Sequence, residues 1–222
     1  MKLIIGNKNY SSWSFRVWLF LTANGIKFEE TRVLLDTPST QSELQQYTDA
    51  ALVPVLHDQG LVIWDSLAIC EYVSDKYLQG RGWPEDVSAR AHARAASAEM
   101  HSGFSALRQR MPMNCRASNR QVEINSELAA NIERIDRLWV KLRSSYKNKG
   151  PWLVGQFSIA DCMFAPVALR FNTYQVKVSD PAQQYADTLR NHPCVKLWVQ
   201  QAIAESEILQ REEVGATITK LT

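Results

Sequence analysis

The feature that most constrains the fold is a change of pattern near residue 80 of this 222-residue chain. Before that point, short apolar runs typical of strands alternate with helical patterns; after it, the strand patterns stop. Such an alternation predicts a small mixed sheet packed against helices, whereas helical patterns alone predict a helical domain. We therefore expect an α/β domain at residues 1–80 and an all-helical domain at residues 88–222, joined by a linker at 79–87 that contains two glycines and a proline.

The first eighty residues fit the order β-α-β-loop-β-β-α. The first helix should end at Gly25, because glycine is favoured just past a helix end. A strand, a helix and a strand imply a right-handed parallel crossover, and the Gly-containing turn at 58–60 implies an antiparallel hairpin. The expected elements are strands at 2–6, 28–34, 53–57 and 61–64 and helices at 14–24 and 66–78.

The second part carries helical patterns throughout. Residues 88–110 are rich in Ala, Arg and Glu, an apolar stripe at helical spacing marks 125–146, and further helices are expected at 158–172, 181–190 and 193–209.

Composition is that of an ordinary soluble globular protein. Hydrophobic residues make up 45%, and 25 basic against 23 acidic residues leave a net charge of +2, so nothing in the charge favours a nucleic acid or an anionic membrane as partner. With no signal peptide and no apolar run of about 20 residues, we expect a cytoplasmic protein without a membrane span. The four cysteines and four histidines lack zinc-ligand spacing, so we expect reduced thiols and no metal site.

Two segments of the first domain contain groups that could contact a ligand. YSSWS (10–14) places two serines between the first strand and the first helix, where α/β proteins commonly bind ligands, although a serine there also caps a helix. In LVPVL (52–56), a proline within an apolar run indicates either an edge strand or a special bond. A cis Val53–Pro54 bond would leave the backbone of Val53 free to pair with an extended peptide.

A third segment, WDSLAI (64–69), opens the helix at 66–78. Ser66 is a natural N-cap, and the carboxylate of Asp65 is favourable near the positive end of a helix. The same helix start could instead receive a ligand carboxylate while Asp65 receives an ammonium group. Taken alone, each of the three segments has an architectural interpretation as well as a functional one.

Together, and in this order, the three segments resemble the glutathione-transferase family. YSSWSFRVWLFL is similar to the serine-type active-site segment of the zeta and tau classes, with a serine five residues before Arg16 and Val17. LVPVL resembles the cis-proline segment of the family, and DSLAI its glutathione-binding E-S-x-A-I signature with Asp in place of Glu.

The helical half extends the resemblance to nearly the whole chain. GQFSIADCMFAP (155–166) is similar to the buried capping-box motif of the family, in which Ser158 caps a helix and Asp161 reaches back to it, so Asp161 is interpreted as structural. HPCVKLW (192–198) matches the start of a late helix of the family.

The resemblance implies a thioredoxin-like glutathione-binding domain, an all-α domain, and a glutathione transferase that uses glutathione as co-substrate without a metal. Ser11 is the implied thiol-activating hydroxyl, with Ser12 as the neighbouring alternative. The implied glutathione-binding residues are Val53 and Pro54 for the cysteinyl backbone and Asp65 and Ser66 for the γ-glutamyl end.

A small hydrophobic electrophile would bind between the domains, near Trp13, Phe104 and Arg108. Zeta isomerases have cysteine where this chain has Trp13, a difference that weakens a maleylacetoacetate-isomerase assignment. A glutathione-dependent isomerase or peroxidase therefore stays an alternative, as does a non-catalytic binding or scaffold protein with this fold. The retained serines and the Asp65–Ser66 pair argue against a scaffold. The family also implies a homodimer.

Overall fold

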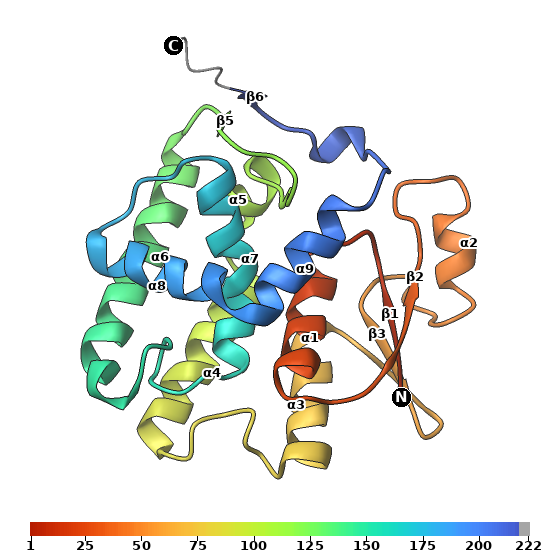
Figure 1. Cartoon of the computed structure of the whole chain (residues 1–222), viewed down its shortest axis with the longest axis horizontal. Helices are drawn as coiled ribbons and strands as arrows, with labels where there is room; N and C mark the ends of the chain where they lie inside the picture. Colours follow the sequence, from red (N-terminus) through yellow and green to blue (C-terminus); the bar gives the residue numbers. More distant parts are fainter. Residues whose placement is uncertain (218–222) are drawn as a thin grey trace.

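The structure, a computed structural model, describes residues 1–217 and has two parts that lie side by side (Figure 1). The first part contains a four-stranded sheet in the order β2-β1-β3-β4. Its elements are β1 (Lys2–Ile5), α1 (Ser12–Ala23), β2 (Glu29–Arg32), α2 (Thr40–Leu44), β3 (Val55–Asp58), β4 (Leu61–Trp64) and α3 (Ser66–Leu78).

The parallel β1–β2 pair and the antiparallel β3–β4 hairpin were expected from the sequence, whereas the place of β3 beside β1 was not. β1 pairs with β2 in parallel, and β3 pairs with both β1 and β4 in antiparallel orientation. This mixed sheet with helices packed on it is a thioredoxin-like fold. α2 was not expected, because its five residues contribute one buried apolar side chain, Leu44, and therefore show no period.

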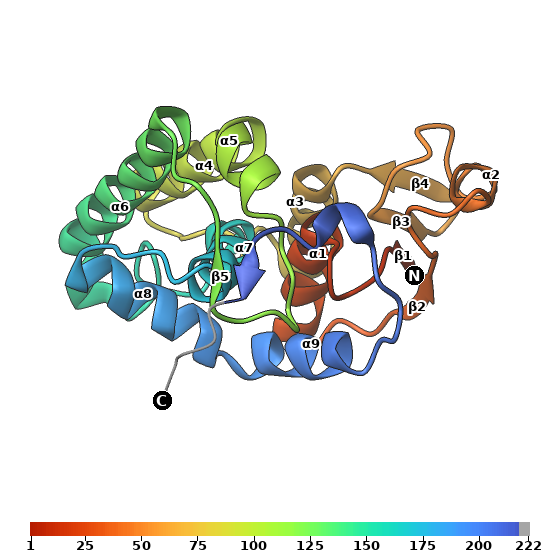
Figure 2. The same cartoon turned by 90° about the horizontal axis from the view of Figure 1, so that it is seen from above.

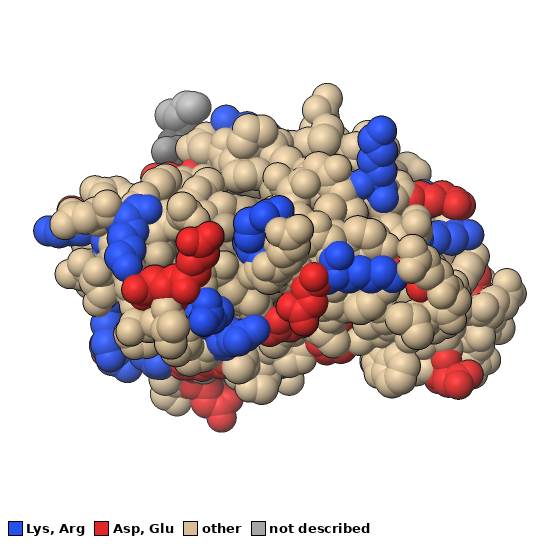
Figure 3. Space-filling view, turned by 90° about the horizontal axis from the view of Figure 1, so that it is seen from below, with Lys and Arg blue, Asp and Glu red and all other residues tan. Residues whose placement is uncertain are grey.

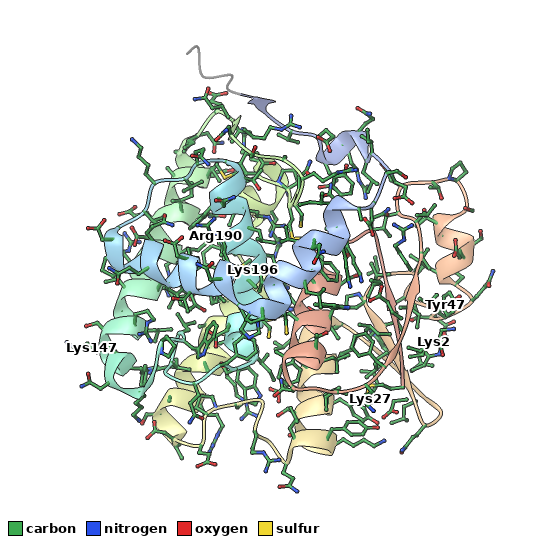
Figure 4. All side chains as sticks on the ribbon, viewed as in Figure 1. Lys2, Lys27, Tyr47, Lys147, Arg190 and Lys196 are labelled. Atoms are coloured by element: carbon green, nitrogen blue, oxygen red, sulfur yellow. The ribbon has the colours of Figure 1, made fainter. Side chains whose placement is uncertain are left out.

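Side chains of β1 fill two different cores. Leu3 and Ile5 belong to the large core shared with α1 and α3, whereas Ile4 packs with Val33, Leu44 and Val55 beneath α2. Successive strand residues point to opposite faces, so the run Leu-Ile-Ile serves both. On the α2 side, Figure 4 shows Tyr47 close to Lys2, whose Nζ lies 5.6 Å from the ring centre.

The second part is helical, and α7 lies at its centre. Nearly every side chain of α7 is buried, because it packs against α4 and α8 of its own part and against α1 of the first part. The helices are α4 (Val87–Ser102), α5 (Ser105–Arg110), α6 (Ser126–Tyr146), α7 (Ile159–Thr173), α8 (Asp180–Asn191) and α9 (Pro193–Ile203). Short elements complete it: η1 (Lys147–Lys149), η2 (Gln210–Glu212) and the pair β5 (Arg120–Gln121) with β6 (Ala216–Thr217).

The predicted capping box is confirmed at the start of α7. The Ser158 N–H donates to Asp161 Oδ2 at 2.9 Å, and the Leu153 N–H and Tyr185 hydroxyl donate to Oδ1 at 2.9 and 2.8 Å. Burial outweighs these hydrogen bonds and raises the pKa of Asp161 to about 6. Asp161 therefore connects three segments of the helical part.

Two predicted helices differ from the structure. The Ala-rich stretch 88–110 is divided at Gly103, where a Cβ would lie 2.7 Å from the carbonyl oxygen of Glu99. The helix expected at 193–209 ends at Ile203. Beyond it, Glu205 accepts hydrogen bonds from the N–H groups of Lys8 and Asn9 at 2.9 and 3.1 Å. Contact with the first part thus replaces a further helical turn.

The two parts share one hydrophobic core. α9 passes beneath α1, as Figure 2 shows, and Trp198 of α9 stacks on Phe15 of α1 with 4.9 Å between ring centres. On the face in Figure 3, basic and acidic groups are interspersed. Among residues 1–217, no helix is both long and apolar enough to cross a membrane.

Candidate functional site

A cavity of about 800 Å³ lies between the two parts, at the N-terminus of α1. The first part contributes the loop before α1, the segment from β2 through α2, and the residues ahead of β3. The second part contributes α5, α7 and the C-terminal segment. Of the site residues predicted from the sequence, Ser11, Ser12, Trp13, Val53 and Arg108 line this cavity, whereas Pro54, Asp65, Ser66 and Phe104 do not.

The edge of the sheet explains why these residues meet. At one end of the sheet, β1, β2 and β4 have their last residues and β3 has its first, since Val55 pairs with both Ile4 and Trp64. The connections that carry Ser11, Val53 and Asp65 therefore emerge side by side. Two of these stretches, with Ser11 and Val53, line the cavity, and the third, with Asp65, begins beside it.

The two serines at the start of α1 have different partners. Ser11 is the N-cap, its Oγ accepts from the Ser14 N–H at 3.4 Å, and its hydroxyl donates to Ser14 Oγ at 2.8 Å. Ser12 Oγ accepts from Arg170 Nη2 at 3.1 Å, and its proton has no acceptor within the described residues. Both side chains are buried, so each hydroxyl has a defined surrounding.

The backbone of Val53 is exposed to a ligand. The Val53–Pro54 bond is cis. Neither the N–H nor the C=O of Val53 makes a hydrogen bond within residues 1–217, because β3 pairing starts at Val55. An unpaired donor and acceptor at a sheet end can receive an extended peptide as an added strand.

The start of α3 differs from the sequence expectation in its cap. Asp65, and not Ser66, is the N-cap, because its Oδ1 reaches the N–H groups of Leu67 and Ala68 at 2.9 and 3.2 Å. Its Oδ2 lies 3.1 Å from Nε2 of His101 on α4. Ser66 begins the helix, and its buried Oγ has no partner among the described residues. A buried hydroxyl without a partner is costly, so Ser66 is a polar group that the described residues leave unsatisfied.

Two arginines, Arg16 and Arg108, lie against Trp13, and a third, Arg170, contacts the neighbouring Ser12; none of the three has a carboxylate partner among residues 1–217. The guanidinium carbons of Arg16 and Arg108 lie 4.2 and 5.6 Å from ring centres of Trp13. Burial, together with the charges of Arg170 and Arg108, lowers the pKa of Arg16 to about 9. Burial also lowers the pKa of Arg170 to about 10. Such a group of cations creates a positive potential that stabilises an anion nearby.

Arg170 and Arg211 line the cavity although the sequence did not single them out. Arg170 had a detectable signal, since it is the lone charged residue in the run CMFAPVALRF of a predicted buried helix. Arg211 had none. Phe104 is buried in the shared core at the start of α5, and its place in the electrophile pocket stays a prediction.

The fold and this edge of the sheet define a glutathione-transferase-type protein, and the comparisons with known proteins agree. Residues 10–76 match the family described as glutathione S-transferase, N-terminal domain. A probable maleylacetoacetate isomerase of Caenorhabditis elegans is 28% identical over 172 residues, which cover 76% of this chain and 78% of the relative.

Solved structures show the same architecture. A maleyl pyruvate isomerase, described as a bacterial zeta-class glutathione S-transferase, has a TM-score of 0.73 at 19% identity and covers 94% of this chain and 100% of its own. A Burkholderia glutathione transferase homolog with bound glutathione has a TM-score of 0.70 at 22% identity and covers 90% and 97%. The first part of the chain thus matches the N-terminal domain of glutathione S-transferases, and the chain as a whole is similar to glutathione transferases and isomerases of the zeta class. Within residues 1–217, no cluster of three His, Cys, Asp or Glu could hold a metal ion.

Proposed function

We propose that this protein is a glutathione-dependent enzyme whose bound thiolate attacks a small, negatively charged electrophile. One observation carries the proposal: two serines at a helix N-terminus and two arginines, which have no carboxylate partner within residues 1–217, meet in a single cavity. In this scheme residues 1–80 form the glutathione-binding domain, and residues 88–222 supply Arg108 and Arg170 to the electrophile site. The arginines favour an anionic electrophile over the purely hydrophobic one that the resemblance implied.

Glutathione would lie along the edge of the sheet. Its cysteinyl backbone would pair with the N–H and C=O of Val53 beside Pro54. Its γ-glutamyl carboxylate would bind at the start of α3, where Ser66 Oγ and the helix N-terminus favour an anion. Its ammonium group would approach Asp65, which already lies 3.1 Å from His101.

The serine would raise the reactivity of the thiol by a hydrogen bond. A free thiol has a pKa of about 8.5, so only a few per cent is ionised at neutral pH. A hydrogen bond to a charged acceptor contributes about 1.5–3 kcal/mol, which corresponds to a pKa lower by about one to two units. The N-terminus of α1 adds a favourable partial charge. Ser11 is the proposed donor, with its hydroxyl proton turned from Ser14 Oγ to the sulfur, and Ser12, whose proton has no acceptor among residues 1–217, is the alternative.

Isomerisation is a second candidate, favoured by Arg108 and Arg170, which form no ion pair with a carboxylate in the described part of the chain. The thiolate would add to a cis double bond conjugated to a carbonyl, and the electron pair would move to the carbonyl oxygen as an enolate. Rotation about the new single bond and expulsion of the thiolate would yield the trans isomer and restore glutathione. Trp13, in place of the zeta cysteine, weighs against this reaction but leaves the arginines in position.

Product analysis separates the candidates. Purified protein would be incubated with glutathione and, in turn, a halogenated aromatic, a hydroperoxide and a maleyl-type dicarboxylate. A transferase consumes glutathione and forms a thioether, a peroxidase forms the disulfide, and an isomerase leaves glutathione unchanged. If calorimetry detects no glutathione binding and all three substrates stay unreacted, the enzyme proposal is wrong and a scaffold role replaces it.

We also propose a homodimer that uses β4. Leu61, Val62 and Trp64 of this edge strand are 52%, 43% and 59% exposed. Neighbouring apolar side chains on an open edge mark an interaction surface, because water contact with them is unfavourable and the edge carries unpaired backbone groups.

A further inference from the structure

Glutathione carries a second carboxylate, on its glycyl residue. The stretch of the first part that this end of glutathione would face, residues 33–53, offers no cation for it. The sheet order β2-β1-β3-β4 places the start of α3 beside β4 and the β2–α2 connection at the opposite side. A tripeptide with its γ-glutamyl end at α3 and its cysteinyl group at Val53 therefore points its glycyl end toward residues 33–53. That stretch contains no Lys, Arg or His, but three acidic residues.

Arg211 supplies a cation to this end of the cavity from the other end of the chain. It lies on η2, lines the same cavity as Val53 and Thr37, and its Nη1 is 3.4 Å from Asp36 Oδ1. Its Nε is 3.3 Å from Glu212 Oε1, whereas Nη2 has no partner within residues 1–217. Guanidinium has five N–H donors in a planar fork, so an unused edge remains for a carboxylate.

The segment that carries Arg211 is fixed on both sides. Before Arg211, the backbone carbonyls of Glu205 and Glu207 accept hydrogen bonds from Arg116 of the helical part. After it, the carboxylate of Glu213 accepts a hydrogen bond from the hydroxyl of Tyr10, in the loop before α1. The hydrogen bonds are Arg116 Nη1 to Glu205 O at 2.6 Å, Arg116 Nη2 to Glu207 O at 2.6 Å, Tyr10 Oη to Glu213 Oε1 at 2.7 Å and Arg120 Nη2 to Glu213 Oε2 at 2.7 Å. The segment thus spans from the helical part to the loop before α1.

We propose that Arg211 binds the glycyl carboxylate of glutathione, so that the C-terminal segment completes the glutathione site. This inference rests on the proposed function. Asp36 and Glu212 compete for the same guanidinium, and the side chain of Arg211 is 61% exposed. The gain in affinity is therefore that of an exposed ion pair, about fivefold, and not that of a buried one.

Calorimetric titration with two ligands tests the inference. Glutathione amide replaces the glycyl carboxylate by a neutral carboxamide of nearly the same size. The unmodified protein should bind glutathione about fivefold more tightly than the amide. Arg211→Gln should remove this preference, because it should lower the affinity for glutathione and leave the affinity for the amide unchanged. Asp36→Asn should raise the affinity for glutathione and leave the affinity for the amide unchanged, because it frees the guanidinium of Arg211 from a competing carboxylate.

Arg137→Gln is the matched control, since the side chain of Arg137 is also 61% exposed and also pairs with a glutamate, Glu133, at 2.6 Å. It should keep the preference. Equal binding of both ligands by the unmodified protein, or a preference that survives in Arg211→Gln, overturns the assignment to Arg211 while the proposed function stands. Absence of binding by either ligand overturns both.

Discussion

Replacing Ser11 by alanine tests whether a hydroxyl at the start of α1 stabilises the thiolate. Ser11→Ala removes two hydrogen bonds with Ser14: the long cap bond from Ser14 N to Ser11 Oγ, at 3.4 Å, and the bond from the Ser11 hydroxyl to Ser14 Oγ, at 2.8 Å. Loss of an N-cap costs about 0.5–2 kcal/mol, and so long a cap bond falls at the low end. Loss of the second bond costs about 0.5–1.5 kcal/mol. The folded protein should therefore persist, and the change in activity can be assigned to the site.

The functional effect should depend on pH. If the hydrogen bond lowers the pKa of the bound thiol by about one to two units, its loss returns that pKa toward about 8.5. At about pH 6.5 the thiolate fraction, and with it the rate of nucleophilic attack, should fall roughly 10- to 60-fold. At about pH 9.5 both proteins hold mostly thiolate, so the rates should differ by less than about twofold.

The assay is ultraviolet absorption of the glutathione thiolate in the complex, titrated against pH, beside turnover measured at the same values. Ser12→Ala is the internal comparison, because Ser12 is equally buried but bound to Arg170. A larger shift in Ser12→Ala would transfer the role to Ser12. A uniform loss of rate at all pH values, without a shift of the thiol pKa, would refute the hydrogen-bond mechanism for both serines.

The remaining predictions concern the electrophile, the capping box and the dimer. Arg108→Gln should raise KM for an anionic electrophile about tenfold and leave the affinity for glutathione unchanged. If the variant and the unmodified protein have the same KM, Arg108 does not bind the electrophile. Burial raises the pKa of Asp161 to about 6, above the unfolded value near 3.9, so its contribution to stability is full below about pH 4 and is lost as pH rises through about 6. Asp161→Asn should abolish that pH dependence in chemical denaturation, yet cost about 2–3 kcal/mol because an amide has one acceptor oxygen where the carboxylate has two. Trp64→Asp should convert a dimer into a monomer in light scattering; a monomeric parent protein would contradict the β4 interface.

Local chemistry made much of the first part predictable. Short β-branched runs, Gly25 after α1 and the turn at 58–60 are signals carried by neighbouring residues, and the β1–β2 and β3–β4 pairs follow from their order. Ser158 and Asp161 were likewise predictable, because a capping box involves residues three apart. α2 was not predicted, because its five mostly polar residues show no hydrophobic periodicity. It is held by Leu44, which packs against Ile4, Val33 and Val55 on one face of the sheet.

The sequence by itself determined the two-part architecture and singled out the three segments, with their serines and their proline, that resemble a glutathione site. Only the tertiary structure decided which charges join them. Arg170 and Arg211 lie far along the chain from Ser11, and nothing in their local sequence records that α7 and the C-terminal segment return to the start of α1. Side-chain periodicity reports which face of an element is buried, whereas contacts between distant elements depend on how whole cores pack.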